Sequence, residues 1–163
     1  MRFEEFAAAR LPALLRYATV LSGDPELARD LVQEALTRAF VHWGRVSGAE
    51  HPYAYVRAIL TNEYLSVRRR RTLPTHPLTW EEPPAEADHA VDSDRKVDLR
   101  RAVLALPPNQ RAVIVLRYYE GLRDEEIAET LACRPATVRS HAHRAFAALR
   151  LNLHDLAGEG SLT

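Results

Sequence analysis

One face of a predicted helix between Arg134 and Leu149 combines arginine, hydroxyl and small side chains. At about 100° per residue, four apolar side chains point within about 40° of one direction: Val138, Ala142, Ala145 and Leu149. The opposite face carries small and polar side chains: Ala136, Thr137, Ser140, His143, Arg144 and Ala147. Small side chains let a helix approach the DNA major groove, where Arg and hydroxyl groups reach bases or phosphates. This face therefore predicts DNA recognition.

The residues around this face support the same chemistry. Arg139 and His141 lie on its flanks, where contact with phosphates is favoured over contact with bases. A short helix at 124–131 and a three-residue turn at 132–134 precede it, which together predict a helix-turn-helix. A helix over 109–120 is predicted before them, and the last helix is predicted to reach about Leu151 or slightly beyond. A helical hairpin with a solvated face has the same spacing, so the spacing alone leaves both interpretations open.

Three further helices are predicted upstream, over 3–21, from Pro25 to about Trp43, and over 53–71, with a loop from Gly44 to Pro52. Asp24 suits an N-cap and Pro25 the first helical position. The apolar periodicity predicts these inward side chains: Phe6, Leu14, Tyr17 and Leu21; Leu27, Leu31, Ala35 and Ala39; Tyr53, Val56, Leu60, Tyr64 and Val67. Away from the core, one polar stripe holds Asp30, Gln33, Glu34 and Thr37, and another face holds Arg57, Thr61 and Arg68, with Asn62 and Arg69 beside it.

The charge is unevenly distributed although the formal net charge is zero. Residues 1–71 include 11 basic and 8 acidic residues, which gives a net charge of +3. Residues 72–98 include 2 basic and 7 acidic residues, a net charge of −5. Residues 99–163 include 9 basic and 7 acidic residues, a net charge of +2. The acidic stretch contains several prolines and no periodic pattern of apolar residues, which predicts a linker. Trp80 is the one large apolar side chain in it. We therefore expect an all-α fold of two small helical domains, 1–71 and 98–152, joined by a flexible linker at 72–97 and followed by a short polar tail at 153–163 with no added regulatory domain.

Several classes of protein are disfavoured by the composition. No run of about 18 apolar residues predicts a membrane span, and the first residues do not resemble a signal peptide, so we expect a cytoplasmic protein. The single cysteine, Cys133, cannot form an internal disulfide, and two nearby histidines without further ligands do not make a metal site. No carboxylate pair, nucleophile with its base, or phosphate-binding glycine loop indicates an enzyme, so no catalytic residue, metal, cofactor or small-molecule substrate is expected.

Three segments resemble the extracytoplasmic-function (ECF) group of the sigma-70 family of RNA polymerase sigma factors, in the style of its actinobacterial members. DPELARDLVQEALTRAFVHW resembles region 2.2, and HPYAYVRAILTNEYLSVRRRR resembles regions 2.3 and 2.4. ALPPNQRAVIVLRYYEGLRDEEIAETLACRPATVRSHAHRAFAALR resembles region 4. The resemblance covers about residues 3–71 and 98–151, and the two halves in this order are a specific signal.

The resemblance implies a role for each half. Region 2.2 implies that Asp30, Gln33, Glu34 and Thr37 bind core RNA polymerase at the β′ coiled coil, the β subunit being a further contact. Regions 2.3 and 2.4 imply that the −10 element is held and an unstacked base captured by Arg57, Thr61, Asn62, Arg68, Arg69, Arg70 and Arg71, with the loop from Val46 to Tyr53 as a pocket wall. Region 4 implies −35 recognition by Arg134, Ala136, Thr137, Arg139, Ser140, His143 and Arg144. An anti-sigma protein between the two domains is a further expected partner, and the acidic linker is also compatible with self-inhibition.

Each implied site has a simpler interpretation. The stripe on 30–37 could be only a solvated face, and the four-arginine run could complement the dipole at a helix C-terminus. We favour DNA binding for the arginines because crowded like charges repel unless a polyanion neutralises them. The chain also departs from the family, which often has Ser or Thr in place of Arg123 and Arg134. Each change removes an N-cap worth about 1 kcal/mol, and we expect Asp124 to replace one of them.

The main alternative function is a stand-alone helix-turn-helix regulator that binds duplex DNA, usually as a dimer, with the N-terminal half as a sensor. The DLVQEAL segment and the helix that ends in four arginines argue against it. The sequence thus favours a non-enzymatic sigma factor that binds core RNA polymerase and directs promoter-specific initiation.

Overall fold

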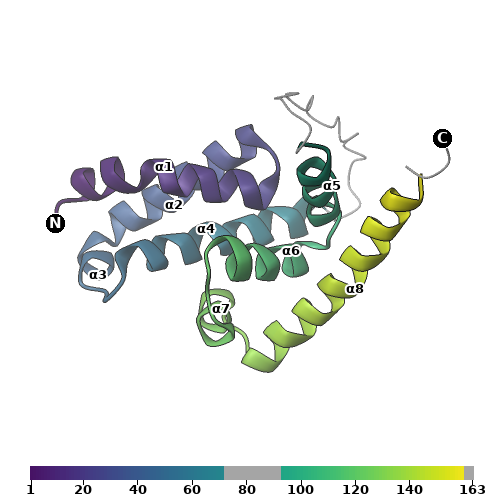
Figure 1. The fold of residues 1–163 in the computed structure, drawn as a ribbon. Coiled ribbons are helices and arrows are strands. Elements are labelled where there is room, and N and C mark those ends of the chain that lie inside the picture. The colour runs from purple at the N-terminus through teal and green to yellow at the C-terminus, as the bar shows by residue number, and fades with distance from the viewer. Residues whose placement is uncertain (72–92, 160–163) are drawn as a thin grey trace.

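A computed structural model describes residues 1–71 and 93–159, and every regular element in these two ranges is helical (Figure 1). The expected all-α fold is confirmed. Most of the predicted linker, including Trp80, lies outside the described residues. Its last five predicted positions, 93–97, begin a helix, because the helical pattern that leads to Leu104 already starts at Ser93.

The first half of the chain is a bundle built on three long helices. These are α1 (Phe3–Ser22), α2 (Pro25–Val41) and α4 (Pro52–Arg71), with the short α3 (Trp43–Ser47) before α4. Figure 1 shows α1 and α2 side by side with α4 running along both of them. The predicted core positions of α1 and α2 are all buried, as are Val56, Leu60 and Tyr64 of α4, whereas Tyr53 and Val67 are partly buried.

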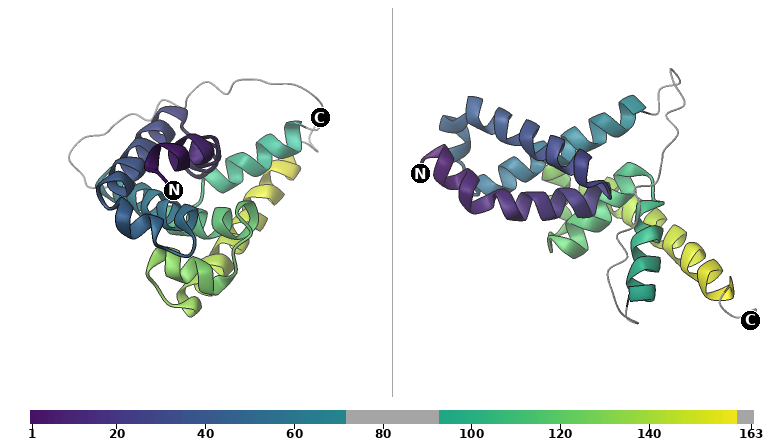
Figure 2. Two further views of the ribbon diagram at one scale, coloured as in Figure 1. Left: turned by 90° about the vertical axis from the view of Figure 1, so that its left-hand side faces the viewer. Right: turned by 90° about the horizontal axis from the view of Figure 1, so that it is seen from above.

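The second half is built on its last helix. It consists of α5 (Ser93–Leu104), α6 (Pro108–Ile114), the π-helical turn η1 (Val115–Tyr119), α7 (Asp124–Leu131) and α8 (Pro135–Glu159). Helices α5, α6 and α7 all pack on α8. In Figure 1 and in the right-hand view of Figure 2, the end of α8 extends away from α1 and α2. The predicted helix-turn-helix is therefore present, with its second helix on the outside of the molecule.

The junction between α1 and α2 has the predicted helix-ending and helix-starting residues. Gly23 adopts a left-handed φ of 70° and its N–H donates to the Thr19 carbonyl, which ends α1. The Asp24 carboxylate accepts from the N–H groups of Glu26 at 3.0 Å and Leu27 at 3.3 Å, which caps α2. The predicted cap at Asp24 is confirmed.

Three predicted boundaries are wrong. The loop from Gly44 to Pro52 contains α3, which forms because Val46 is completely buried in the bundle. The helix expected over 109–120 is α-helical only to Ile114; then Glu120 N–H bonds to the Val115 carbonyl at 3.2 Å, which adds one residue to the turn. The last helix, predicted to reach about Leu151 or slightly beyond, extends to Glu159.

The two halves are packed against each other and share one hydrophobic core. Helix α4 contacts both α6 and α7, and α1 contacts η1. The largest cluster of buried apolar side chains joins Leu21 and Leu60 of the first half to Leu116 and Ile127 of the second. Among the described residues, no helix has the length and hydropathy needed to cross a membrane.

Replacing the cap of α2 should weaken the first half measurably. We expect Asp24→Ala to lower the free energy of unfolding by about 1 kcal/mol, because two N–H groups at the helix start lose their acceptor. Urea denaturation followed by circular dichroism measures the change. Asp24→Asn is the matched control, since Asn also caps helices, and it should stay within a few tenths of a kcal/mol of wild type. Equal stability of the Ala and Asn variants would contradict the assignment of the cap.

Candidate nucleic-acid interface

The outer face of α8 is exposed along the residues that the sequence singles out. Five of them line a shallow surface depression of about 470 Å³: Ala136, Arg139, Ser140, His143 and Arg144. Thr137 and Arg134 are also exposed. Arg and hydroxyl groups thus surround a concave, small-residue surface, which has the chemistry of a helix that enters a DNA groove.

The inner face of α8 holds this surface in place. Val138, Ala142, Ala145 and Leu149 are buried, as predicted. Ile127 and Ala128 of α7 are buried with them, and Leu131 is partly buried. Because the apolar face fixes the rotation of α8 about its axis, the polar face must point to solvent.

The turn between α7 and α8 is formed without glycine. Ala132 adopts a left-handed φ of 53°, and Cys133 N–H bonds to the Ala128 carbonyl at 3.0 Å, which closes the end of α7. The Arg134 carbonyl accepts from Thr137 N–H at 3.0 Å and Val138 N–H at 3.2 Å, so α8 starts on backbone bonds. The Arg134 side chain stays exposed.

The start of α7 is capped differently from the prediction. Asp124 does not act as its cap, because its carboxylate forms an ion pair with Arg117. Instead Glu126 reaches back and accepts from Arg123 N–H at 3.3 Å and from its Nε at 2.9 Å. These bonds to Arg123 lower the pKa of Glu126. The N3 carboxylate therefore replaces the missing Ser or Thr at the cap.

His141 lies on the flank of the exposed outer face of α8, which we call the reading face. Partial burial, and then the positive charge of Arg144, lower its pKa from the usual 6.5. Both causes favour the neutral ring, which offers a hydrogen bond to a phosphate rather than a charge. Among the described residues, no three His, Cys, Asp or Glu side chains gather as a metal site would require.

The arginine-rich end of α4 forms a second basic surface. Arg69, Arg70 and Arg71 are exposed and Arg68 is partly buried. Glu63 bonds to Arg70 at 3.2 Å and to Arg38 of α2 at 3.0 Å, so this carboxylate links α4 to α2. The last four residues of α4 are thus all arginines, and three of them are exposed.

Two of the other three predicted binding residues of α4 are buried, and the third, Asn62, is exposed. Arg57 is 7% exposed and Thr61 is completely buried, so neither side chain is open to DNA in this arrangement. The Asn62 amide donates to the Thr130 carbonyl of α7 at 2.8 Å. The physical reason is tertiary: Arg57 pairs with Glu120 of the second half and Thr61 with Tyr17 of α1, and helix periodicity cannot reveal either contact.

Arg57 is neutralised by an acidic residue of the second half. Its Nη1 lies 3.0 Å from Oε2 of Glu120, and the two side chains are only 8% and 13% exposed. The Tyr53 hydroxyl donates to the other oxygen of Glu120 at 3.4 Å. Burial, and then the negative charge of Glu120, raise the pKa of Tyr53 to about 12, so this hydroxyl keeps its proton. Sequence reasoning missed Glu120, which lies 63 positions from Arg57.

Thr61 is bonded inside the first half. Its hydroxyl donates to the Arg57 carbonyl at 2.7 Å, and its oxygen lies 2.6 Å from the Tyr17 hydroxyl. Since the one proton of Thr61 is directed to that carbonyl, Tyr17 is the donor of the second bond. Burial is the main cause that raises the pKa of Tyr17.

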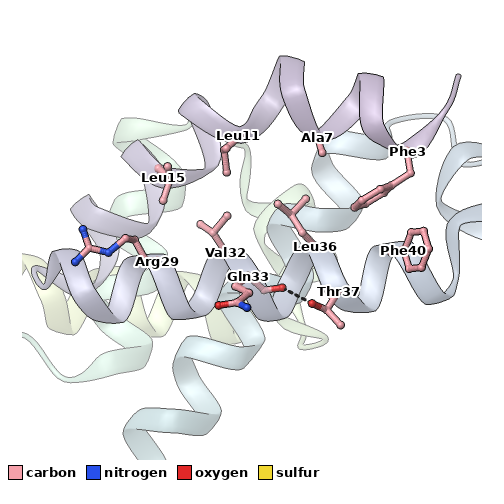
Figure 3. Close-up of a pocket in the computed structure, with 10 residues that line it drawn as sticks. All are labelled: Phe3, Ala7, Leu11, Leu15, Arg29, Val32, Gln33, Leu36, Thr37 and Phe40. Carbon is pink, nitrogen blue, oxygen red and sulfur yellow. Dashed lines mark hydrogen bonds between the residues drawn. The ribbon is translucent and has the colours of Figure 1, made fainter.

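The polar stripe of α2 lies on the surface next to an apolar groove. Asp30, Gln33 and Thr37 are exposed, and Glu34 is half-exposed and bonded to Arg38 at 2.8 Å. Figure 3 shows Gln33 and Thr37 at one edge of a groove between α1 and α2. Its volume is about 670 Å³, and its lining is mostly apolar: Phe3, Ala7, Leu11, Leu15, Val32, Leu36 and Phe40, with Arg29. The sequence analysis missed this groove; the exposed Leu11 and Phe40 are its signal.

Two family descriptions match the chain, one in each half. "Sigma-70 region 2" matches residues 6–73, and "Sigma-70, region 4" matches residues 96–149. The RNA polymerase sigma-E factor of Streptomyces avermitilis is 36% identical over 157 residues, which cover 94% of this chain and 86% of that protein. The ECF RNA polymerase sigma factor SigL of Mycobacterium tuberculosis is 32% identical over 162 residues, covering 94% and 88%.

A solved structure is similar over both halves together. It is the sigma factor RpoE from Bartonella quintana, crystallised in complex with the anti-sigma factor NepR. The sequence identity is 25%, the TM-score is 0.67, and the alignment covers 93% of this chain and 96% of that chain.

The buried hydroxyl pair should stabilise the fold. We expect Thr61→Val to lower the free energy of unfolding by about 1–3 kcal/mol, because the Tyr17 hydroxyl is left buried without an acceptor. Chemical denaturation measures this loss. Adding Tyr17→Phe to that variant should restore part of it, since both polar groups are then gone. Thr137→Val, at an exposed threonine, should change stability by no more than about 0.5 kcal/mol. A similar loss in both single threonine variants would contradict the role of the pair.

Proposed function

Because the chain belongs to the ECF group of the sigma-70 family, and is thus a non-enzymatic RNA polymerase sigma factor that directs transcription initiation, we propose a specific division of labour between its two halves. The first half, 1–71, binds core polymerase and the −10 element. The second half, 98–152, reads the −35 element.

Helix α8 is the reader of the −35 element. The observation that supports this assignment is the exposed face formed by Arg134, Ala136, Thr137, Arg139, Ser140, His143 and Arg144, opposite a fully packed apolar face. Arg144 lines the depression on the side of α8 opposite its apolar face and suits base edges, whereas Arg134 and Arg139 suit phosphates.

Helix α4 holds the −10 element as the strands separate. Its exposed arginines, from Arg69 to Arg71, provide the charge that a DNA backbone requires, with Arg68 beside them. Arg57, Thr61 and Asn62 are the −10 residues nearer the start of α4, and Arg57 contacts DNA only when Glu120 of the second half moves off it. A single strand is bound by such a combination of positive charge and a shaped pocket.

The surface of α2 binds core RNA polymerase, at the β′ coiled coil, with the β subunit as a further contact. Asp30, Gln33, Glu34 and Thr37 provide the polar contacts, and the neighbouring groove offers apolar area beside them. Polar edges around an apolar centre are the usual composition of a protein interface.

An anti-sigma protein is the proposed regulatory partner, and the cytoplasm is the proposed location. The support for the partner is the similarity, over both halves, to a sigma factor that was crystallised with an anti-sigma factor. The location follows from the function, because core polymerase and promoter DNA are found there in bacteria.

Reconstitution with core RNA polymerase tests the proposal. We expect specific run-off transcripts from a cognate promoter with the complete chain, and negligible binding of duplex DNA by the free chain. Run-off transcription and fluorescence anisotropy with promoter duplex measure the two properties. Tight, sequence-specific duplex binding without polymerase would contradict the division of labour and favour a stand-alone regulator.

Arg144→Ala should impair −35 recognition selectively. We expect transcription from a promoter that depends on its −35 element to fall by about tenfold, since one good contact between Arg and a base is worth about 1–3 kcal/mol. Arg150→Ala is the matched control, because Arg150 is also exposed on α8 but lies six residues beyond Arg144 and does not line the depression.

Core binding distinguishes the two halves in the same assay. Arg144→Ala should retain wild-type affinity for core polymerase, whereas Asp30→Arg should lose it through reversed charge on the α2 stripe. Loss of core binding by Arg144→Ala would show that the halves are wrongly assigned.

A further inference from the structure

Glu120 is bound by donors that all come from the proposed −10 half. Arg57 holds one carboxylate oxygen and Tyr53 holds the other, at 3.0 and 3.4 Å. All three residues are at least partly shielded from water, and Glu120 is the acidic partner of the buried Arg57. A side chain of the second half thus fills an anion-binding site of the first.

The groups around Glu120 are those that bind a DNA strand. The guanidinium carbons of Arg10 and Arg57 lie 5.2 and 5.4 Å from the centre of the Tyr53 ring. Guanidinium groups bind phosphate, and an aromatic ring flanked by cations stacks on bases of any sequence. The Glu120 carboxylate carries the charge that a phosphate oxygen would bring to the same place.

We propose that Glu120 is an internal competitor for the single DNA strand, so that the packed arrangement of the two halves is an autoinhibited state. This inference rests on the proposed role of α4 in binding the −10 strand. The strand gains access to Arg57 and Tyr53 only when Glu120, and with it the second half, leaves them.

Other contacts also hold the two halves together. The Asn62 amide is bonded to the Thr130 carbonyl, and Arg111 donates to the Leu21 carbonyl at 3.4 Å. Leu104 lies so close to Gly23 that a Cβ added there would come within 2.6 Å of it. The reading face of α8 remains exposed, so the closed arrangement hides −10 residues and leaves the −35 reader free.

The dimensions of a promoter require the closed arrangement to open. The −10 and −35 elements are about 25 base pairs apart, which is on the order of 85 Å of B-DNA at 3.4 Å per base pair. A compact chain of this length has a radius of gyration of only about 15 Å. Both halves therefore reach their elements only after they separate, and Glu120 leaves Arg57 when they do.

Glu120→Gln tests the competition directly, since it removes the charge and keeps the shape. We expect the complete chain to bind a short, fluorescein-labelled DNA strand of random sequence about tenfold more tightly, because the competent state is no longer suppressed. Glu129→Gln is the matched control: it changes net charge equally at an exposed position of α7 and should leave the affinity unchanged. An equal gain in both variants would reduce the effect to net charge and overturn the proposal.

The separation of the halves is measured by electron–electron resonance between spin labels. The labels are attached at Ser47→Cys and Arg150→Cys, both exposed, in a Cys133→Ser background. Glu120→Gln should shift the distance distribution to longer values. With Glu120 intact, adding the DNA strand should produce the same shift, and this second measurement decides the question even if the Gln variant does not fold.

Two further results would overturn the inference. One is strand binding by the chain with Glu120 intact and no change in label distance; the other is longer distances in Glu120→Gln without tighter strand binding. Run-off transcription separates this failure from that of the proposed function. A chain that initiates specifically with core polymerase but shows either result is a sigma factor in which Glu120 does not compete with DNA.

Discussion

Helix α4 is buried on two neighbouring sides, and the rest of the structure depends on the contacts that each side requires. One side is apolar, with Leu60 and Tyr64 completely buried in the bundle. The other side contains Arg57 and Thr61, which cannot be buried without partners for their charge and hydroxyl group. Tyr17 of α1 forms a hydrogen bond with the Thr61 hydroxyl, and Glu120 of the second half forms an ion pair with Arg57. The two halves are thereby joined by polar contacts as well as by the shared core.

Such an interface is suited to a molecule that has to open. A buried ion pair is strongly specific, but its net stabilisation is small because both charges lose their hydration. When the halves separate, water or DNA phosphate can replace each partner of the pair, so no charge remains unsatisfied. The apolar part of the shared core opposes separation, and binding to core polymerase and promoter DNA must supply the free energy that offsets it.

The surfaces proposed for DNA and polymerase differ in how firmly the fold determines them. The reading face of α8 is fixed by one helix and its own apolar side, so it is already formed in the closed state. The α2 surface is likewise formed by the packing of α1 on α2, which leaves Phe40 exposed at the edge of the groove. The −10 surface alone is divided between an exposed arginine-rich end and a covered part near Arg57.

The sequence by itself determined what depends on local periodicity and capping. It predicted the helical class, the cap at Asp24, the buried and exposed faces of α8 and the helix-turn-helix, because helix geometry assigns each side chain to a face. Only the tertiary structure decided which second face of α4 is covered, that Glu120 pairs with Arg57, and that α1 and α2 leave a groove between them. These features join residues far apart in the chain, and they arise from packing and desolvation, to which no local pattern is sensitive.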